Sequence, residues 1–136
     1  MHIKANTRMI QVRRIYDRSL PDDNVYLILV DRLWPRGISK DRVRVDLWLK
    51  EIAPSDGLRR WFGHNPARWN KFRDRYFAEL RSKPELVKVI LDKSKISPVC
   101  LLYGAKDEEH NNAVALKEFL DLKLDQPKSA MINIKN

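Results

Sequence analysis

The chain has 136 residues, 43% of them hydrophobic, which is enough for one domain with a buried core. Its 27 lysines and arginines outnumber its 18 aspartates and glutamates, and the net charge of +9 predicts attraction to phosphates, nucleotides or nucleic acid. Bases and acids nevertheless alternate, as in residues 71–75 (KFRDR), which favours solvated helix faces over one surface for a polyphosphate. Nucleic acid is therefore the second choice of partner, behind an anionic small molecule.

The single cysteine, Cys100, excludes an internal disulfide and a cysteine-rich zinc site. It lies in an apolar run, residues 99–103, where a buried structural thiol is favoured over a reactive one. The start, MHIKANTR, has no apolar leader segment, and no stretch reaches the length of a membrane span. These features predict a soluble, cytoplasmic protein with no membrane partner.

Two strands are expected in the first thirty residues. Residues 25–30 (VYLILV) are six consecutive apolar residues, too few for an ordinary helix, and predict a strand buried on both faces. Residues 9–15 (MIQVRRI) alternate loosely and predict a first strand. The residues between them, 16–24, are too few for a helical crossover, so by length alone the two strands should pair antiparallel.

The next segment is expected to be helical. Ser39 resembles a helix cap, and the helix would run through residues 40–53 to a stop at Pro54. The β-branched Val43 and Val45 leave extended structure open as the alternative.

Three shorter signals follow. Ser55 predicts the cap of a short helix that ends at Gly63. Asn65 and Pro66 then predict the start of the next helix, because proline is tolerated at the first helical position. That helix carries a stripe at helical spacing that is expected to face the core: Trp69, Phe72, Tyr76 and Leu80.

The last third of the chain predicts a helix, a strand and a helix. Pro84 begins the first helix, with an inner face formed by Leu86, Val87, Ile90 and Leu91. Residues 96–103 predict a second buried strand. Asp107 is the expected cap of the final helix, whose apolar positions are Ala113, Leu116, Leu120 and Leu124.

Together these elements predict a single α/β domain over residues 9–124, with a small, mostly parallel sheet covered by helices in a Rossmann-like layered sandwich. Residues 1–8 and 125–136 are tails, expected to be mobile or to add an edge strand. In open sheets of this kind, ligands bind beyond the carboxyl ends of the strands. The predicted site therefore lies where the exits after Val30 and Tyr103 converge.

The first exit carries two forked donors and a carboxylate. Arg32 and Arg36 are suited to holding an anionic group, while Asp31 would orient one arginine or act as a base. The alternative is an internal Asp–Arg network that only pins the loop. Trp34 belongs to the same predicted site, although packing beside Pro35 is favoured over stacking on a ligand.

The second exit carries Asp107, His110 and Asn111, which would share one side of the final helix if Asp107 is its cap. His110 is either an acid/base group, positioned by Asn111, or a hydrogen-bonded packing residue. His64, in a turn, is a possible addition to the site. A metal bound by Asp31, His64 and His110 is conceivable, but their spacing predicts no metal site. The sequence does not identify a cofactor.

Three motifs in order resemble one family: residues 31–37 (DRLWPRG), residues 46–55 with 58–80 (DLWLKEIAPS and LRRWFGHNPARWNKFRDRYFAEL), and residues 101–120 (LLYGAKDEEHNNAVALKEFL). They are similar to the family called domain of unknown function 488, in its short YeaO-like branch. The resemblance spans residues 9–120 and implies an α/β fold with no established activity.

Longer relatives in that family carry an acid–arginine pair and, near the start of the helix after the last buried strand, a Cys-His-Arg triplet. Asp31 and Arg32 match the pair. The corresponding turn reads Glu109-His110-Asn111, so the histidine persists and the thiol is absent. The resemblance therefore implies that thiol chemistry is lost and that His110 remains.

The leading expectation is a small enzyme or ligand-binding protein acting on an anionic, phosphate- or nucleotide-like small molecule. One alternative is a basic nucleic-acid-binding module driven by the net charge. The other is a non-catalytic partner-binding protein that uses exposed aromatics such as Trp34 or Trp48 as anchors. The sequence does not predict whether the protein is a monomer or an oligomer.

Overall fold

The computed structural model of the protein describes residues 10–17, 21 and 23–125. Its four strands form one parallel sheet in the order β1-β4-β2-β3. They are β1 (Ile10–Arg14), β2 (Tyr26–Leu29), β3 (Leu47–Trp48) and β4 (Val99–Tyr103). The predicted tails lie outside the described residues except for Asp125.

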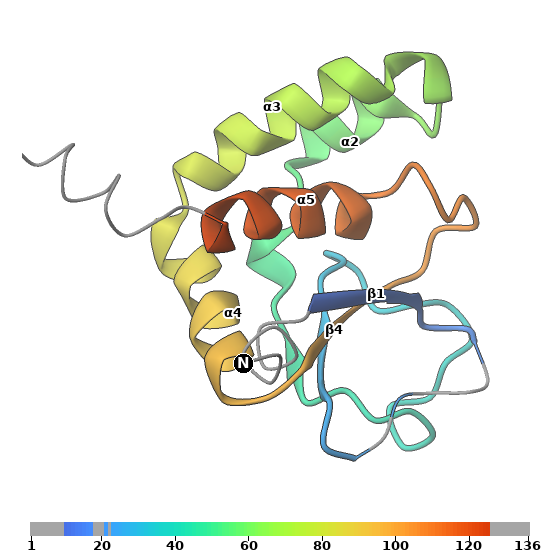
Figure 1. The fold of residues 1–136 in the computed structure, drawn as a ribbon. Coiled ribbons are helices and arrows are strands. Elements are labelled where there is room, and N and C mark those ends of the chain that lie inside the picture. Colours follow the sequence, from blue (N-terminus) through green and yellow to red (C-terminus); the bar gives the residue numbers. More distant parts are fainter. Residues whose placement is uncertain (1–9, 18–20, 22, 126–136) are drawn as a thin grey trace, which may run out of the picture.

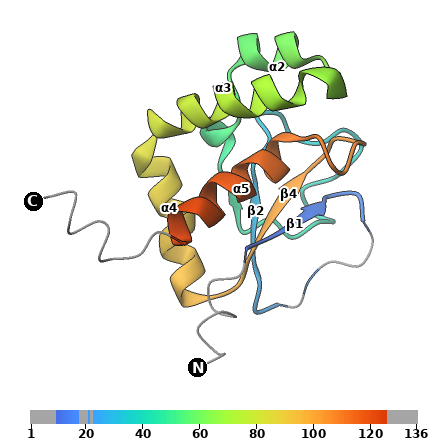
Figure 2. The ribbon, with the colours of Figure 1, turned by 45° about the horizontal axis from the view of Figure 1, so that its top comes forward.

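The helices are α2 (Asp56–Phe62), α3 (Trp69–Arg81), α4 (Pro84–Ile96) and α5 (Asn112–Leu124), with short 3-10 turns η1 (Lys50–Ile52) and η2 (Pro66–Arg68). They gather on one side of the sheet, with α5 lying between α3 and the strands (Figures 1 and 2). No helix in the described parts of the chain combines the length and the apolar character that crossing a bilayer requires. The parallel α/β architecture predicted from the sequence is confirmed.

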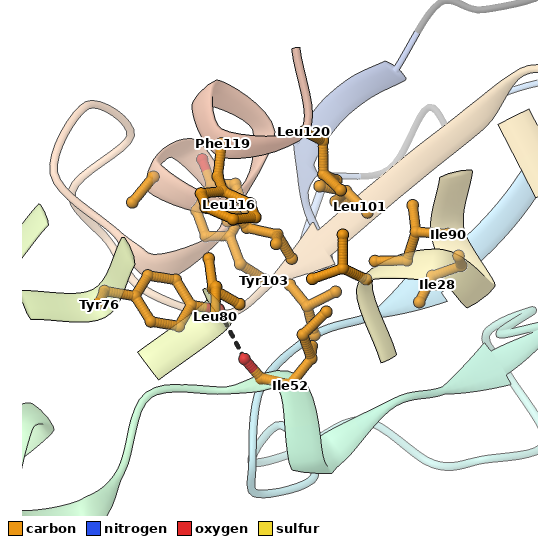
Figure 3. Packing of buried hydrophobic residues seen from close by; sticks show 14 of the residues in the cluster. Ile28, Ile52, Tyr76, Leu80, Ile90, Leu101, Tyr103, Leu116, Phe119 and Leu120 are labelled. Atoms are coloured by element: carbon orange, nitrogen blue, oxygen red, sulfur yellow. Dashed lines mark hydrogen bonds between the residues drawn. The ribbon is translucent and has the colours of Figure 1, made fainter. Parts of the chain in front are cut away.

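Two apolar clusters hold the sheet from its two faces. On the helical face, residues from β2 and β4 such as Ile28 and Leu101 pack against α3, α4 and α5 (Figure 3). On the other face, Leu27, Leu29 and Cys100 are covered by the segment between β2 and η1. That segment contributes Trp34, Ile38, Val43, Val45 and Trp48. An irregular segment, rather than a helix, therefore closes the second face.

Strand β4 lies in the middle of the sheet, and all five of its residues are buried. A strand covered on both faces has no polar positions to present, which explains its continuous apolar sequence. Burial raises the pKa of the Cys100 thiol to about 11. The prediction that this thiol is buried is confirmed, and the raised pKa favours its protonated form at neutral pH.

The predicted antiparallel pairing of the first two strands is wrong. Strand β1 pairs with β4 in parallel, with Ile10 opposite Val99, and β2 lies on the other side of β4. The expectation rested on the dozen or more residues that a crossover through a helix needs. The link here, residues 15–25, only has to run back from the end of β1 to the start of β2, which is the length of one strand. At about 3.3 Å per residue it reaches about 36 Å, roughly twice the length of a five-residue strand.

The predicted helix after Ser39 is also wrong. The segment forms turns, then the two-residue strand β3 and the 3-10 turn η1. Asp46 explains part of this, because its carboxylate accepts from Leu27 N at 2.8 Å and its own N–H donates to Leu27 O at 2.9 Å. The open alternative, extended structure favoured by Val43 and Val45, describes the segment better.

The helix-start signals after Pro54 are confirmed. Ser55 Oγ accepts from Leu58 N at 3.2 Å, and Gly63 ends α2 with a left-handed φ of 53°. Asn65 caps η2, which continues into α3. Along α3 the predicted stripe faces the core, with Phe72, Tyr76 and Leu80 buried and Trp69 half-buried.

In α4, Val87 and Ile90 are buried, and Leu86 and Leu91 pack beside them, which confirms the predicted inner face. The strand predicted over residues 96–103 begins later, at Val99.

Candidate functional site

A cleft of about 590 Å³ opens at the carboxyl edge of the sheet, among the exits of β1, β2 and β4, helix α2 and the start of α5. Seven of the eight predicted site residues line it: Asp31, Arg32, Trp34, Arg36, His64, His110 and Asn111. The eighth, Asp107, does not line it but contacts His110. Residues from distant parts of the sequence thus share one cleft, while their roles stay predictions.

Asp31 joins three elements at the floor of the cleft. Its Oδ2 accepts from Gly104 N at 2.8 Å, and its Oδ1 accepts from Asn112 Nδ2 at 3.1 Å. Burial raises the pKa of the Asp31 carboxyl, and the hydrogen bonds from Asn112 and Gly104 oppose that rise. Among the described residues no arginine forms an ion pair with Asp31, so the alternative of an internal Asp–Arg network is not formed.

Arg32 turns toward η1 and α2 instead. Its Nη2 donates to Ala53 O at 3.3 Å and to Pro54 O at 3.4 Å. Its Nη1 lies 3.5 Å from Glu51, and its Nε lies 4.0 Å from Asp56. The Nε is buried without a hydrogen-bond partner. Most of the Arg32 fork is therefore engaged within the chain, which limits what it can offer an anion.

Arg36 is exposed, and its guanidinium has no hydrogen-bond or ion-pair partner in the part of the chain that the structure describes. Its backbone is fixed, because the hydroxyl of Tyr16 donates to Arg36 O at 2.7 Å. Gly37 follows in a left-handed conformation with φ of 75°. Arg36 thus presents a free, forked donor at the cleft from an anchored backbone.

His110 is oriented by Asp107. One oxygen of Asp107 accepts from the N–H groups of Glu109 at 2.9 Å and His110 at 3.0 Å, and the other accepts from His110 Nδ1 at 2.9 Å. These bonds, led by that from Glu109 N, lower the pKa of the Asp107 carboxyl. An ionised carboxylate only accepts, so Nδ1 carries the proton and Nε2 of the neutral ring keeps its lone pair. The ring also contacts the Trp69 ring edge-on at 5.3 Å.

The prediction that Asp107 caps the last helix is wrong. Helix α5 begins at Asn112 and is capped by Asn111, whose Oδ1 accepts from Val114 N at 2.9 Å. Asn111 Nδ2 donates to Asp107 O at 2.9 Å, and the residue is buried. Asp107 therefore closes a turn before the helix, and Asn111 serves the backbone. Asparagine is as good a cap as aspartate, so the sequence alone did not separate the two.

Trp34 packs within the fold, in agreement with the prediction that favoured packing over stacking on a ligand. Its Nε1 donates to Ile38 O at 2.7 Å, and its ring lies edge-on to Trp48 with centroids 5.4 Å apart. Trp48 Nε1 donates to Asp31 O at 2.8 Å. Both indoles are half-buried, so they are not the exposed anchors that the partner-binding alternative requires.

His64 lies in the left-handed region with φ of 56°, directly after Gly63, and is exposed at the cleft. A non-glycine residue there costs on the order of 1 kcal/mol, and such strain is often found where a side chain has a function. Asp31, His64 and His110 do not form a metal-binding group. Nor does any other set of three His, Cys, Asp or Glu side chains within the described residues.

Twelve residues lining the cleft were absent from the predicted site, and four of them are Tyr16, Arg59, Gly104 and Asn112. Tyr16 lies two residues after the end of β1 and Gly104 directly follows β4, so the rule that ligands bind at the carboxyl ends points to both. Tyr16 was missed because β1 was expected to pair antiparallel, which would have put its exit at the opposite edge. No sequence signal distinguishes Arg59 from the other arginines of α2 and α3.

Gly104→Ala is expected to destabilise the protein by about 1 kcal/mol, because small-to-large changes at packed positions cost about 1–3 kcal/mol. The new Cβ would lie 3.3 Å from Asp31 Oδ2 and 3.7 Å from Tyr16 Cε2. Urea denaturation measures the change. Gly57→Ala is the control, since a Cβ there meets nothing within 4 Å. Equal effects of the two substitutions would contradict close packing at Gly104.

Comparison with known proteins gives one consistent result. Residues 9–133 match the family model described as "Inactive DUF488-N3 subclade". The chain is 43% identical to the uncharacterized protein YeaO of Escherichia coli over 111 residues, covering 82% of this chain and 96% of that protein. It is 41% identical to the uncharacterized proteins Mb3100c of Mycobacterium bovis and Rv3073c of Mycobacterium tuberculosis over 92 residues, covering 66% of this chain and 77% of each. No solved structure matches the chain.

Proposed function

Since the chain belongs to the DUF488 family, in the subclade described as inactive DUF488-N3, we propose that it binds an anionic small molecule in the cleft without converting it. The proposed ligand is phosphate- or nucleotide-like. The observation that carries the proposal is the guanidinium of Arg36, which is free of partners in the described structure and lines a cleft of about 590 Å³. That volume is in the range of small-molecule sites.

Other groups support binding of an anion beside Arg36. Arg59 of α2 lines the cleft, and its only ion pair in the described residues is with Asp56 at 3.5 Å. The 13-residue helix α5 begins at the cleft, so its positive end faces the same space. Nε2 of His110 becomes a donor when the ring is protonated. The cleft thus carries positive charge on two of its sides.

The rest of the cleft favours an organic ligand over a bare ion. Its apolar lining includes Pro54, Phe62, Phe72 and Ala105. Asp31 repels a bare anion, yet each of its oxygens keeps a lone pair beyond the bond to Gly104 or Asn112. A hydroxyl group is the natural donor to such an acceptor. A ligand with a phosphate and hydroxyls, such as a nucleotide, can place its phosphate at Arg36 and a hydroxyl at Asp31.

Binding without turnover is supported by the chemistry that the site lacks. Glu109 stands where longer relatives carry a thiol, and the buried Cys100 does not line the cleft. The description of the matching subclade as inactive agrees with this. An enzyme that uses Asp31 and His110 as acid and base is the alternative. We also propose that the protein acts in the cytoplasm, where Cys100 stays reduced.

Arg36→Ala tests the proposal. We expect the wild-type protein to bind AMP in isothermal titration calorimetry, and the variant to bind at least about tenfold more weakly, since a charge-assisted bidentate contact contributes about 1.5–3 kcal/mol. The melting temperature should change little because the side chain has no partner to lose. Arg42→Ala removes the same charge from an exposed position outside the cleft and is the control.

AMP and inorganic phosphate should both be tested, and AMP recovered after overnight incubation should be unchanged. Consumption of AMP would favour the enzyme alternative and overturn binding without turnover. If neither compound binds, or if Arg42→Ala weakens binding as much as Arg36→Ala, the cleft is not the anion site.

A further inference from the structure

A second basic surface lies on α2, η2 and α3, outside the cleft. We define the Trp61 surface as Trp61, Arg68, Lys71 and Arg75, none of which lines the cleft. The guanidinium carbons of Arg75 and Arg68 lie 4.3 Å and 5.2 Å from the centroid of the Trp61 ring. Arg68 also donates to the carbonyl of Trp61. One indole therefore holds two guanidiniums in place at the surface.

Lys71 extends this surface along α3. It is three residues after Arg68 and four before Arg75, a spacing that puts all three side chains on one helix face. All three are exposed. Figures 1 and 2 show α2 and α3 side by side at one end of the molecule, with no other element lying over their outer side.

The positive charge of the Trp61 surface is not neutralised. Within the described residues no carboxylate lies within 4.0 Å of the charged nitrogens of Arg68, Lys71 or Arg75, and Asp74, which borders them, forms no ion pair. The other acids of α2 and α3 are engaged elsewhere: Asp56 with Arg59 and Arg32, and Glu79 with Ser55. On α4, by contrast, Lys88 and Lys95 both pair with Asp92. The Trp61 surface is thus a free cluster of cations.

The charged side chains of residues 71–75, which alternate in sequence, lie on different faces of α3. Arg73 leaves the group and pairs with Glu118 of α5 at 3.5 Å. Lys71 and Arg75 lie with Arg68 on the outer face. The mixed sequence therefore folds so that three cations share one exposed face.

We propose that the Trp61 surface binds the phosphodiester backbone of a nucleic acid. Arg75 lies over the indole with no hydrogen-bond partner in the described residues, and Arg68 uses one nitrogen for the Trp61 carbonyl, so both guanidiniums keep N–H groups that can donate to phosphate oxygens. Contacts to backbone phosphates carry no base information, so the binding is independent of sequence. This surface is separate from the small-molecule cleft, and the inference does not depend on the ligand proposed there.

The test is fluorescence anisotropy with a labelled 20-nucleotide single-stranded RNA, and with the DNA of the same sequence, at 50 and 200 mM salt. Three phosphate contacts predict a salt slope of about −2.1, which is an affinity loss of about 20-fold between the two concentrations. The double variant Arg68→Gln with Arg75→Gln should bind more weakly at 50 mM salt. Its affinity should fall only about threefold between 50 and 200 mM salt, because one phosphate contact remains. The control, Lys88→Gln with Lys95→Gln, changes the net charge equally and should behave as the wild type.

A second variant guards against misfolding. Lys71→Gln removes one charge without changing a contact of the Trp61 ring. The affinity of this variant should fall about sevenfold between the two salt concentrations, because two phosphate contacts remain. The proposal is overturned if the wild type does not bind at 50 mM salt, or if the arginine double variant, folded by circular dichroism, matches the α4 control. Equal affinity for polyglutamate overturns the assignment to nucleic acid. Loss of RNA binding in Arg36→Ala alone would place the nucleic acid in the cleft instead.

Discussion

Tyr76→Ala is expected to lower the free energy of unfolding by about 4 kcal/mol, in the range measured when a large buried aromatic side chain is truncated. Tyr76 is the largest fully buried side chain among the described residues, and it lies between α3 and η1 in the helical core (Figure 3). Its removal leaves a cavity that the neighbouring Leu80 and Phe72 cannot fill without moving. Because a domain of this size has only about 5–15 kcal/mol of stability, the variant should unfold at markedly lower urea concentration.

Tyr76→Phe separates the hydrogen bond from the packing. The hydroxyl of Tyr76 donates to Ile52 O at 2.7 Å, and its loss leaves a buried carbonyl without its donor. The expected cost is about 1–2 kcal/mol, clearly less than that of the alanine variant. Equal costs for the two substitutions would show that the aromatic ring contributes nothing to the core.

The same hydrogen bond links the core to the site. Ile52 ends η1, and the next residues, Ala53 and Pro54, supply the carbonyls that take the guanidinium of Arg32. Tyr76 therefore fixes the position of one wall of the cleft from inside the core. Tyr76→Phe should weaken AMP binding less than Arg36→Ala, since it shifts a wall and removes no ligand contact.

The fold was predictable where local chemistry agrees with the tertiary structure. The apolar runs of β2 and β4, the Ser55 and Asn65 caps and the α3 stripe all carry signals that depend on the segment alone. The segment after Ser39 failed because a helix-cap residue was followed by residues whose structure is fixed by distant partners. Asp46 pairs with the backbone of Leu27, and no local pattern reveals that bond.

The candidate site was predictable to the extent that it follows from parallel strands. Once residues 25–30 and 99–103 are read as buried parallel strands, Arg36 and His110 must lie near one edge, and they do line one cleft. What the sequence does not reveal is which groups are already occupied. Asp31 bonds to Gly104 rather than to an arginine, and Asn111 rather than Asp107 caps α5. Both outcomes depend on side-chain geometry at hydrogen-bond distance, which spacing does not specify.

The other large effect is expected at Asp31. Asp31→Ala should destabilise the protein by about 2 kcal/mol, because the N–H of Gly104 loses its acceptor in a partly buried place and the amide of Asn112 loses one of its two acceptors, keeping only Val30 O. Asp31→Asn keeps one acceptor oxygen and should cost less. The comparison is made by urea denaturation at pH 7. An alanine variant as stable as the wild type would show that the carboxylate does not hold β2, β4 and α5 together.

The pH dependence of the same variants has a defined sign. Burial raises the folded-state pKa of Asp31 above 3.8, so the folded protein binds this proton more tightly than the unfolded chain does. The neutral form therefore stabilises the fold. That contribution is fully present below 3.8 and is lost as pH rises through the raised pKa. Relative to Asp31→Asn, which does not titrate, the wild type should gain stability as pH falls from 7 toward 4.

Asp92 provides the control of opposite sign. Its pKa is lowered, chiefly by the hydrogen bond from Lys88, so its ionised form stabilises the fold and the effect is lost as pH falls through its folded pKa. Relative to Asp92→Asn, the wild type should lose stability in acid. If the Asp31 pair instead changes with pH in the same direction as the Asp92 pair, the hydrogen bonds from Gly104 and Asn112 outweigh burial. Asp31 would then stay ionised as an acceptor for a ligand hydroxyl down to low pH.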